Sequence, residues 1–173
     1  PPPADIYARP SPAETAELLA QAKAGQRSAQ LELGRRYYGG DGVPRDPAIA
    51  ARWYRQAAEA GDDQAQSALA MLLFSGDGVA QDQPQALRWW QKAATRGNAE
   101  AQANLGWFYF NGVGVHLDAG RGYAWTSIAA DGGVERARIN REEFARGMNA
   151  QQLARGRRLA ADWQARIRAS LAP

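Results

Sequence analysis

The chain has 173 residues, of which 45% are hydrophobic and 23% charged, and its net charge is +3. This length and balance fit one globular domain and exclude a wholly disordered chain. No apolar run approaches the roughly 18–20 residues that span a bilayer. Cysteine is absent, which excludes disulfides, thiolate metal sites and cysteine nucleophiles.

The N-terminal region opens on three prolines instead of a methionine. We therefore expect a processed product or a fragment whose export signal has been removed, and a periplasmic or secreted location more than a cytoplasmic one. Residues 1–11 are proline-rich and are expected to form an extended linker. Residues 12–24 are expected to form one helix, in which Glu17 stands where later copies of the pattern have tryptophan.

A 36-residue unit then recurs without gaps. Its glycines and tryptophans keep one interval, at Gly25, Gly61, Gly97 and Gly133 and at Trp53, Trp89 and Trp125. Such a period is typical of a solenoid, in which each unit buries its apolar face against its neighbours. We place the repeats at 26–61, 62–97 and 98–133, a C-terminal cap at 134–173, and the whole solenoid at 12–173.

Each unit is expected to be a pair of helices joined by a glycine-rich turn. The first helix carries an Ala-Gln pair and a leucine, as in Ala29, Gln30 and Leu33. The second begins at an aspartate N-cap (Asp46, Asp82, Asp118) and ends at the recurring glycine. Its apolar stripe includes two adjacent aromatic residues in the second copy, Trp89 and Trp90, and we expect Trp89 in the core.

The C-terminal cap is expected to contain two helices. The first covers 134–146, and Asn149 caps a long second helix. That last helix directs four residues inward, namely Leu153, Ala160, Trp163 and Ile167.

The recurring string Ala-Gln-x-x-Leu-Gly-x-x-Tyr, then Gly-x-Gly-Val, then Asp-x-x-x-Ala-x-x-Trp-Tyr, resembles the Sel-1-like repeat family, relatives of tetratricopeptide solenoids. The segments 123–133 and 148–153, with Trp163, resemble the family's C-terminal capping unit. The resemblance implies an all-α, right-handed α/α superhelix of about three repeats with capping helices. It also implies a protein-binding role in bacterial envelope assembly, secretion or signalling, without catalysis or cofactors. Arg36 departs from the pattern, because Leu72 and Phe108 hold that place in the other copies.

Catalytic motifs find no support in the sequence. The glycine-rich turns lack the Lys-Ser/Thr of a phosphate-binding loop, and Asp41 and Asp77 lack the ligand density of a calcium loop. His116, the single histidine, lies in the third turn without a nucleophile motif, so we interpret it as a solvated loop residue. We expect no enzyme, metal site or nucleic-acid partner.

The predicted partner-binding surface lies on the first helices, at positions offset from the core stripe and facing the hollow of the superhelix. Its main residues are Arg35, Tyr38, Met71, Phe74, Trp107 and Phe110, with Leu31, Ser67 and Ala103 on the same stripe. Aromatic, Met and Arg side chains are enriched in binding patches. For Tyr38, Phe74 and Phe110, packing between helices remains an equal alternative.

A second basic surface is predicted near the C-terminus, where residues 135–173 carry a net charge of +5 against −2 for the rest. Its residues are Arg138, Arg141, Arg155, Arg157 and Arg158, and solvated helix faces are the alternative. The partner is expected to be another protein or a peptide, bound by a monomer that acts as a scaffold. The alternative function is an immunity-type inhibitor that blocks one enzyme or toxin.

Overall fold

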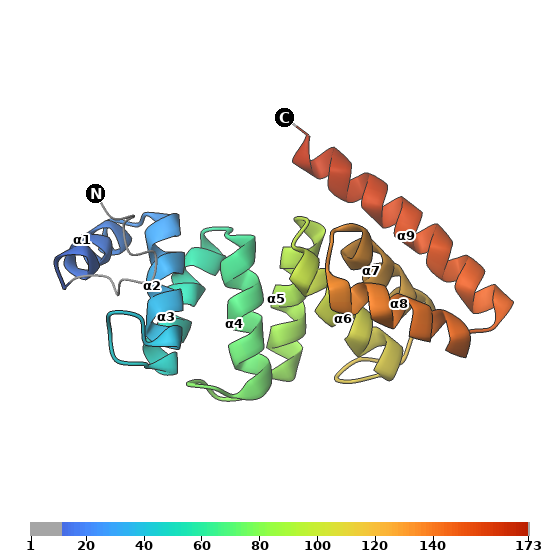
Figure 1. Ribbon diagram of the computed structural model, residues 1–173, viewed down its shortest axis with the longest axis horizontal. Helices are drawn as coiled ribbons and strands as arrows, with labels where there is room; N and C mark the ends of the chain where they lie inside the picture. Colours follow the sequence, from blue (N-terminus) through green and yellow to red (C-terminus); the bar gives the residue numbers. More distant parts are fainter. Residues whose placement is uncertain (1–11, 173) are drawn as a thin grey trace, which may run out of the picture. The chain divides into compact units, whose positions relative to one another are not determined.

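The computed structural model describes residues 12–172, and all the regular structure of this part is helical (Figure 1). The expected linker at 1–11 lies outside the described residues. The all-α repeat architecture is confirmed. Its elements are α1 (Pro12–Lys23), α2 (Arg27–Gly39), α3 (Pro47–Glu59), α4 (Asp63–Ser75), α5 (Gln83–Thr95), α6 (Ala99–Asn111), α7 (Ala119–Asp131), α8 (Glu135–Gly147) and α9 (Ala150–Leu171).

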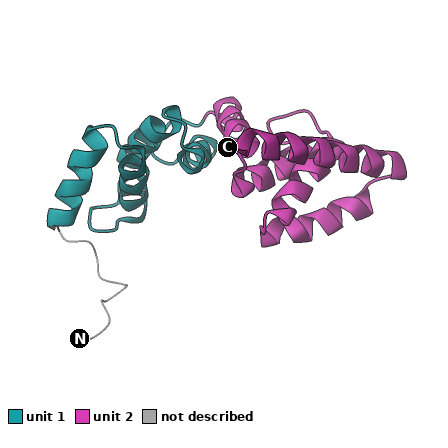
Figure 2. Ribbon diagram, turned by 90° about the horizontal axis from the view of Figure 1, so that it is seen from above, with its two compact units in different colours: residues 1–81 teal, residues 82–173 magenta. Residues whose placement is uncertain are grey.

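The chain divides into two compact units, coloured separately in Figure 2. Unit 1 is Pro1–Gln81 and holds α1 to α4, whereas unit 2 is Asp82–Pro173 and holds α5 to α9. Consecutive helices pack against each other from α1 to α4 and from α5 to α8, whereas α9 packs on α7.

Helix ends follow the local sequence signals. The Asp46 side chain accepts hydrogen bonds from the backbone N–H groups of Ala48 and Ile49, and Asp82 and Asp118 cap α5 and α7 in the same way. These bonds satisfy backbone donors that the first helical turn leaves unpaired. The glycine two residues after α3 has the left-handed φ of 89° at Gly61, and its equivalents match it, as predicted.

The glutamine of each repeat joins its helix to the end of the preceding helix, a role that the sequence pattern did not predict. Gln66 is buried in α4 and donates from Nε2 to the carbonyl oxygen of Ala58, at the end of α3, over 3.1 Å. Gln30 and Gln102 donate in the same way to Ala22 and Ala94. Each of these carbonyls also accepts from the N–H of the following glycine, so the glutamine adds a second hydrogen bond that ties the next helix to the helix end.

Helices α1 to α4 together form the hydrophobic core of unit 1. Leu33 and Leu69 are fully buried, and Tyr54 of α3 packs directly on α2. A methyl group at Gly34 would overlap the ring of Tyr54, so glycine here permits the close approach of the two helices. Arg36 is half-buried and donates to Glu32 and to the Thr15 hydroxyl, whereas Leu72 is buried. The polar substitution thus serves the contact with α1.

Unit 2 is organised around α7, which packs against α6, α8 and α9. The expected last helix is confirmed as α9, the long red helix of Figure 1, and the Asn149 and Gln152 side chains form a capping box at its start. The Trp163 ring lies 4.7 Å from that of Trp125. At Gly156 a Cβ would lie 2.9 Å from Cδ1 of Tyr123, so glycine lets α9 approach α7 closely.

The choice of Trp89 as a core residue was wrong. Trp89 is half-buried, with the Lys92 ammonium 4.4 Å from its ring centre, whereas the next residue, Trp90, is 1% exposed and packs on Phe108. Tyr54 is likewise buried and Trp53 half-buried. One residue turns the side-chain direction by about 100° around a helix, so adjacent aromatics face different surroundings.

Candidate protein-binding surface

In unit 1, the predicted surface residues on α2 and α4 are mostly exposed. Arg35 is exposed, and Tyr38 and Met71 are 40% and 45% exposed. Phe74 is half-buried. Of the supporting positions, Ser67 is half-buried, but Leu31 is buried, so its assignment to the exposed stripe was wrong.

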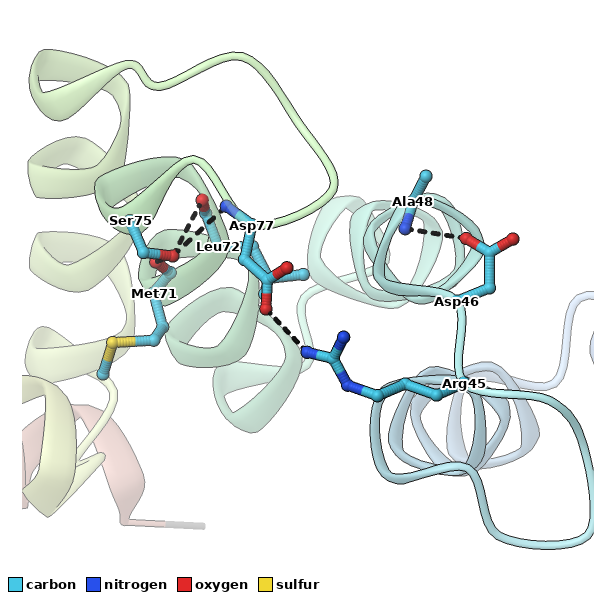
Figure 3. Close-up of polar contacts among 7 residues, drawn as sticks. All are labelled: Arg45, Asp46, Ala48, Met71, Leu72, Ser75 and Asp77. Atoms are coloured by element: carbon cyan, nitrogen blue, oxygen red, sulfur yellow. Dashed lines mark hydrogen bonds and ion pairs between the residues drawn. The ribbon is translucent and has the colours of Figure 1, made fainter.

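Neighbouring polar contacts hold this face of unit 1. Arg35 donates to the amide oxygen of Gln64 on α4. Arg45 lies 5.3 Å from the ring centre of Tyr38 and donates to Asp77 over 2.9 Å, which joins the turn after α2 to the turn after α4 (Figure 3). In the same view the Met71 side chain extends away from that ion pair.

Beneath this face lies Tyr54, a buried phenol. Burial raises the pKa of Tyr54 to about 12, although the nearby Arg35 guanidinium opposes the rise. The phenol is therefore neutral at physiological pH. It acts as a packing group under Arg35.

In unit 2, the same helix position is held by Trp107, which is 42% exposed and meets the buried Phe108 edge-on at 5.3 Å. Phe110 is half-buried and stacks on Phe144 of α8, with ring centres 3.6 Å apart. Packing between helices therefore accounts for Phe110. Ala103 is 2% exposed, which corrects its assignment to the open stripe.

The predicted basic surface is largely neutralised by neighbouring carboxylates. Arg138 pairs with Glu135, Arg141 with Asp131, and Arg155 donates to both oxygens of Asp118 over 2.6 and 2.9 Å. The remaining two residues, Arg157 and Arg158, are exposed on α9. The five arginines therefore do not act as one free cationic cluster.

The Arg155–Asp118 pair joins the start of α7 to α9. The hydrogen bonds from Arg155 hold the pKa of Asp118 below its usual range, and the same contact raises the pKa of Arg155. Asp118 is also the N-cap of α7. One carboxylate thus serves both the helix end and the contact with α9.

A groove in unit 2, absent from the sequence prediction, lies between α9 and the helices α5, α6 and α7. Its volume is about 430 Å³. The aromatic residues lining it are Tyr109, Trp125 and Trp163, and its charged residues are Arg121 and Arg166. It could not be predicted from the repeat pattern, because α9 is not a copy of any repeat helix.

Other classes of site have no counterpart in the part of the chain that the structure describes. No group of three or more His, Cys, Asp and Glu side chains within residues 12–172 is placed to hold a metal ion. His116 is exposed in the turn before α7. Among the described helices, none is long and apolar enough to cross a membrane.

The Sel1 repeat model matches residues 27–62, 63–98 and 99–134. The chain belongs to the Sel1 repeat family. A Sel1 repeat protein from Oxalobacter formigenes is similar to it, with 38% identity and a TM-score of 0.67 over 74% of this chain and 96% of that one. The sequence has no significant match among curated proteins.

A second solved relative of this Sel1 repeat chain is c5321, a protective antigen present in uropathogenic Escherichia coli strains. It is 28% identical with a TM-score of 0.61, and the match covers 90% of this chain. This chain spans 41% of that protein's length. Sel1 repeats generally mediate protein–protein interaction, so membership of the family indicates protein partners.

Proposed function

We propose that this Sel1 repeat chain is a non-enzymatic scaffold that binds a partner protein through the exposed side of the first helices of its repeats. The observation that carries the proposal is one repeat position that stays exposed while its chemistry changes. Arg35, Met71 and Trp107 hold it. Aromatic, Met and Arg side chains are enriched in binding patches.

Packing duty does not account for this position. The next position in each copy holds Arg36, Leu72 and Phe108, which are half-buried or buried. The three side chains of the proposed position, by contrast, are all exposed. Variation of a solvent-facing position along a repeat array instead suits recognition of an irregular partner surface.

The test compares variants in each unit separately. Arg35→Ala with Met71→Ala alters unit 1, Trp107→Ala alters unit 2, and the triple variant combines them. The control is Arg52→Ala with Arg88→Ala, two exposed residues on the second helices. Partners captured from the source organism by the full chain are identified by quantitative mass spectrometry, and their Kd values are then measured by calorimetry.

We expect the triple variant to keep its helical circular dichroism and to lose at least about tenfold in affinity, since single hot-spot residues contribute about 2 kcal/mol or more. The control should bind like the parent. A folded triple variant with unchanged Kd for every captured partner would contradict this placement of the surface.

The cellular role of the scaffold and the compartment in which it acts can also be tested. The two solved relatives compared above are bacterial, and one is described as a protective antigen, which favours an envelope, secretion or signalling role. Fractionation of the source organism with an antibody to the chain checks this. An immunity-type inhibitor would instead bind a single enzyme or toxin tightly through a standard-size interface and abolish its activity.

A further inference from the structure

The groove of unit 2 has the size of a ligand site. At about 430 Å³ it falls within the range of roughly 300–1,000 Å³ typical of small-ligand sites. Helix α9 forms one wall, and residues of α5, α6 and α7 form the rest. All its lining residues belong to unit 2, so the groove is complete within that unit.

The base of the groove is aromatic. Trp125 of α7 is only 6% exposed and lies against Trp163 of α9, at a ring distance of 4.7 Å and an angle of 35°. Tyr109 and Ile167 add to this apolar lining. The contact between the two rings fixes their orientation, so they offer a pre-formed surface for a bulky apolar group.

The charge of the lining is entirely positive. Arg121 and Arg166 line the groove, and none of its lining residues is a carboxylate. Asp118 already accepts two hydrogen bonds from Arg155, and Nε of Arg121 stands 3.5 Å from the same carboxylate. Arg121 thus keeps donor capacity for a further anion.

Arg166 can bind a ligand carboxylate if that carboxylate takes the place of its present partner, Asp162. Arg166 contacts both oxygens of Asp162, one turn away on α9, at 3.0 and 3.2 Å, and both side chains are at least half exposed. Water screens ion pairs between exposed side chains, so a ligand carboxylate can compete with Asp162 for Arg166. Gln91, exposed at the rim, carries an amide that can both donate to and accept from a peptide backbone.

We propose that this groove binds a short acidic peptide segment of the partner protein, in which a carboxylate stands beside a bulky apolar side chain. The apolar side chain packs on Trp125 and Trp163, and the carboxylate pairs with Arg121 and Arg166. Guanidinium groups bind carboxylates through charge-assisted hydrogen bonds of fixed geometry. The inference deepens the proposed scaffold function and rests on it, but it uses different residues from the first-helix surface.

The test measures fluorescence anisotropy of the full chain with a panel of fluorescein-labelled heptapeptides. Each contains two Glu and two Phe or Leu residues in all permuted positions within a Gly-Ser background. One matched panel replaces Glu by Gln, and another replaces Phe and Leu by Ser. We expect at least one acidic–apolar peptide to bind tenfold or more tightly than both matched peptides.

The variant Arg121→Gln with Arg166→Gln should lose that preference at least tenfold, because it removes both cations of the groove. Both side chains are exposed, so we expect the variant to fold. The control, Arg157→Gln with Arg168→Gln, removes the same charge from exposed sites on α9 outside the groove and should keep the preference. Inorganic phosphate at millimolar concentration should compete weakly.

Equal binding of the Glu and Gln panels would overturn the proposal, as would equal loss in the control variant. Full displacement by phosphate would assign the groove to free anions instead of a peptide. If the groove variant still captures every cellular partner while the first-helix triple variant loses them, the groove inference fails and the scaffold function stands. If instead the groove variant loses the partners and the first-helix triple variant keeps them, the groove is the main contact surface.

Discussion

Helices α5 and α7 occupy the same place in successive repeats, yet their surroundings differ. In α5 four residues are buried, Ala86, Trp90, Ala93 and Ala94. In α7 every residue from Gly122 to Ala129 is buried. Two neighbours of α7 account for the difference: α6 packs closely on Gly122 and Thr126, and α9 covers Tyr123 and Trp125.

The two helices show that a repeat motif specifies a helix but not its environment. Trp89 and Trp125 are equivalent in the repeat, but the first is half-buried and the second only 6% exposed. Their sequences reflect this difference, since α5 carries Arg88 and Lys92 where α7 has uncharged residues. A helix with no charged face is expected to be buried all round. The absence of charged residues from 122–130 could therefore have predicted that other helices surround α7.

The largest effect is expected at Trp90. Trp90→Ala should cost about 3–5 kcal/mol, the usual range for a buried indole, because this side chain is 1% exposed and packs on Phe108. Trp89→Ala, the adjacent half-buried indole, is the matched control and should cost clearly less. Urea unfolding monitored by circular dichroism measures both. Equal costs would remove the distinction between the two faces of α5.

A charge placed at equivalent positions tests the comparison directly. Ser127 of α7 is 7% exposed, and its equivalent in α5, Gln91, is exposed. We expect Ser127→Lys to destabilise the fold by about 3 kcal/mol, because an unpaired charge would be buried. Gln91→Lys should change the free energy of unfolding by less than about 0.5 kcal/mol. A stable Ser127→Lys protein would show that α7 is not covered.

Removing the Trp163 side chain of α9 should leave α7 exposed to solvent, as α5 is. Trp163→Ala is expected to cost about 2 kcal/mol, less than a fully buried indole, because Trp163 is only half-buried. Trp125 should then become solvated, which shifts the tryptophan emission to longer wavelength. Amide exchange should accelerate in α9 and leave unit 1 unchanged. Leu171→Ala, at an exposed site on the same helix, should have neither effect.

The smallest effect concerns the ion pair that holds α9 to the start of α7. Because Arg155 lowers the pKa of Asp118, the pair contributes stability above the unfolded carboxyl pKa of about 3.9 and loses it as pH falls through the lowered folded value. Arg155→Gln should cost about 0.5–1 kcal/mol at pH 7 and progressively less below pH of about 4. Urea unfolding at several pH values measures this.

Arg168→Gln is the control for the pH series, since Arg168 is exposed on the same helix. It should match the parent at every pH. A stability difference for Arg155→Gln that persists unchanged in acid would mean that the side chain acts through packing instead of charge.

The candidate surface was only partly predictable from the sequence. Arg35, Met71 and Trp107 are exposed as the helical spacing indicated, because one face of a helix follows from its period. Phe110 has the same period, but it stacks on Phe144. The groove required Tyr109, Trp125 and Arg166 to meet from three different helices, and no local pattern contains that information.

The sequence by itself determined where helices begin and end. Asp46, Asp82 and Asp118 cap their helices and Gly61 takes the left-handed conformation, because these interactions join residues a few positions apart. Only the tertiary structure decided that Trp90 rather than Trp89 is buried, and that Trp163 covers Trp125. Burial depends on which distant segment removes water from a side chain, and here α9, which repeats no earlier helix, supplies that cover.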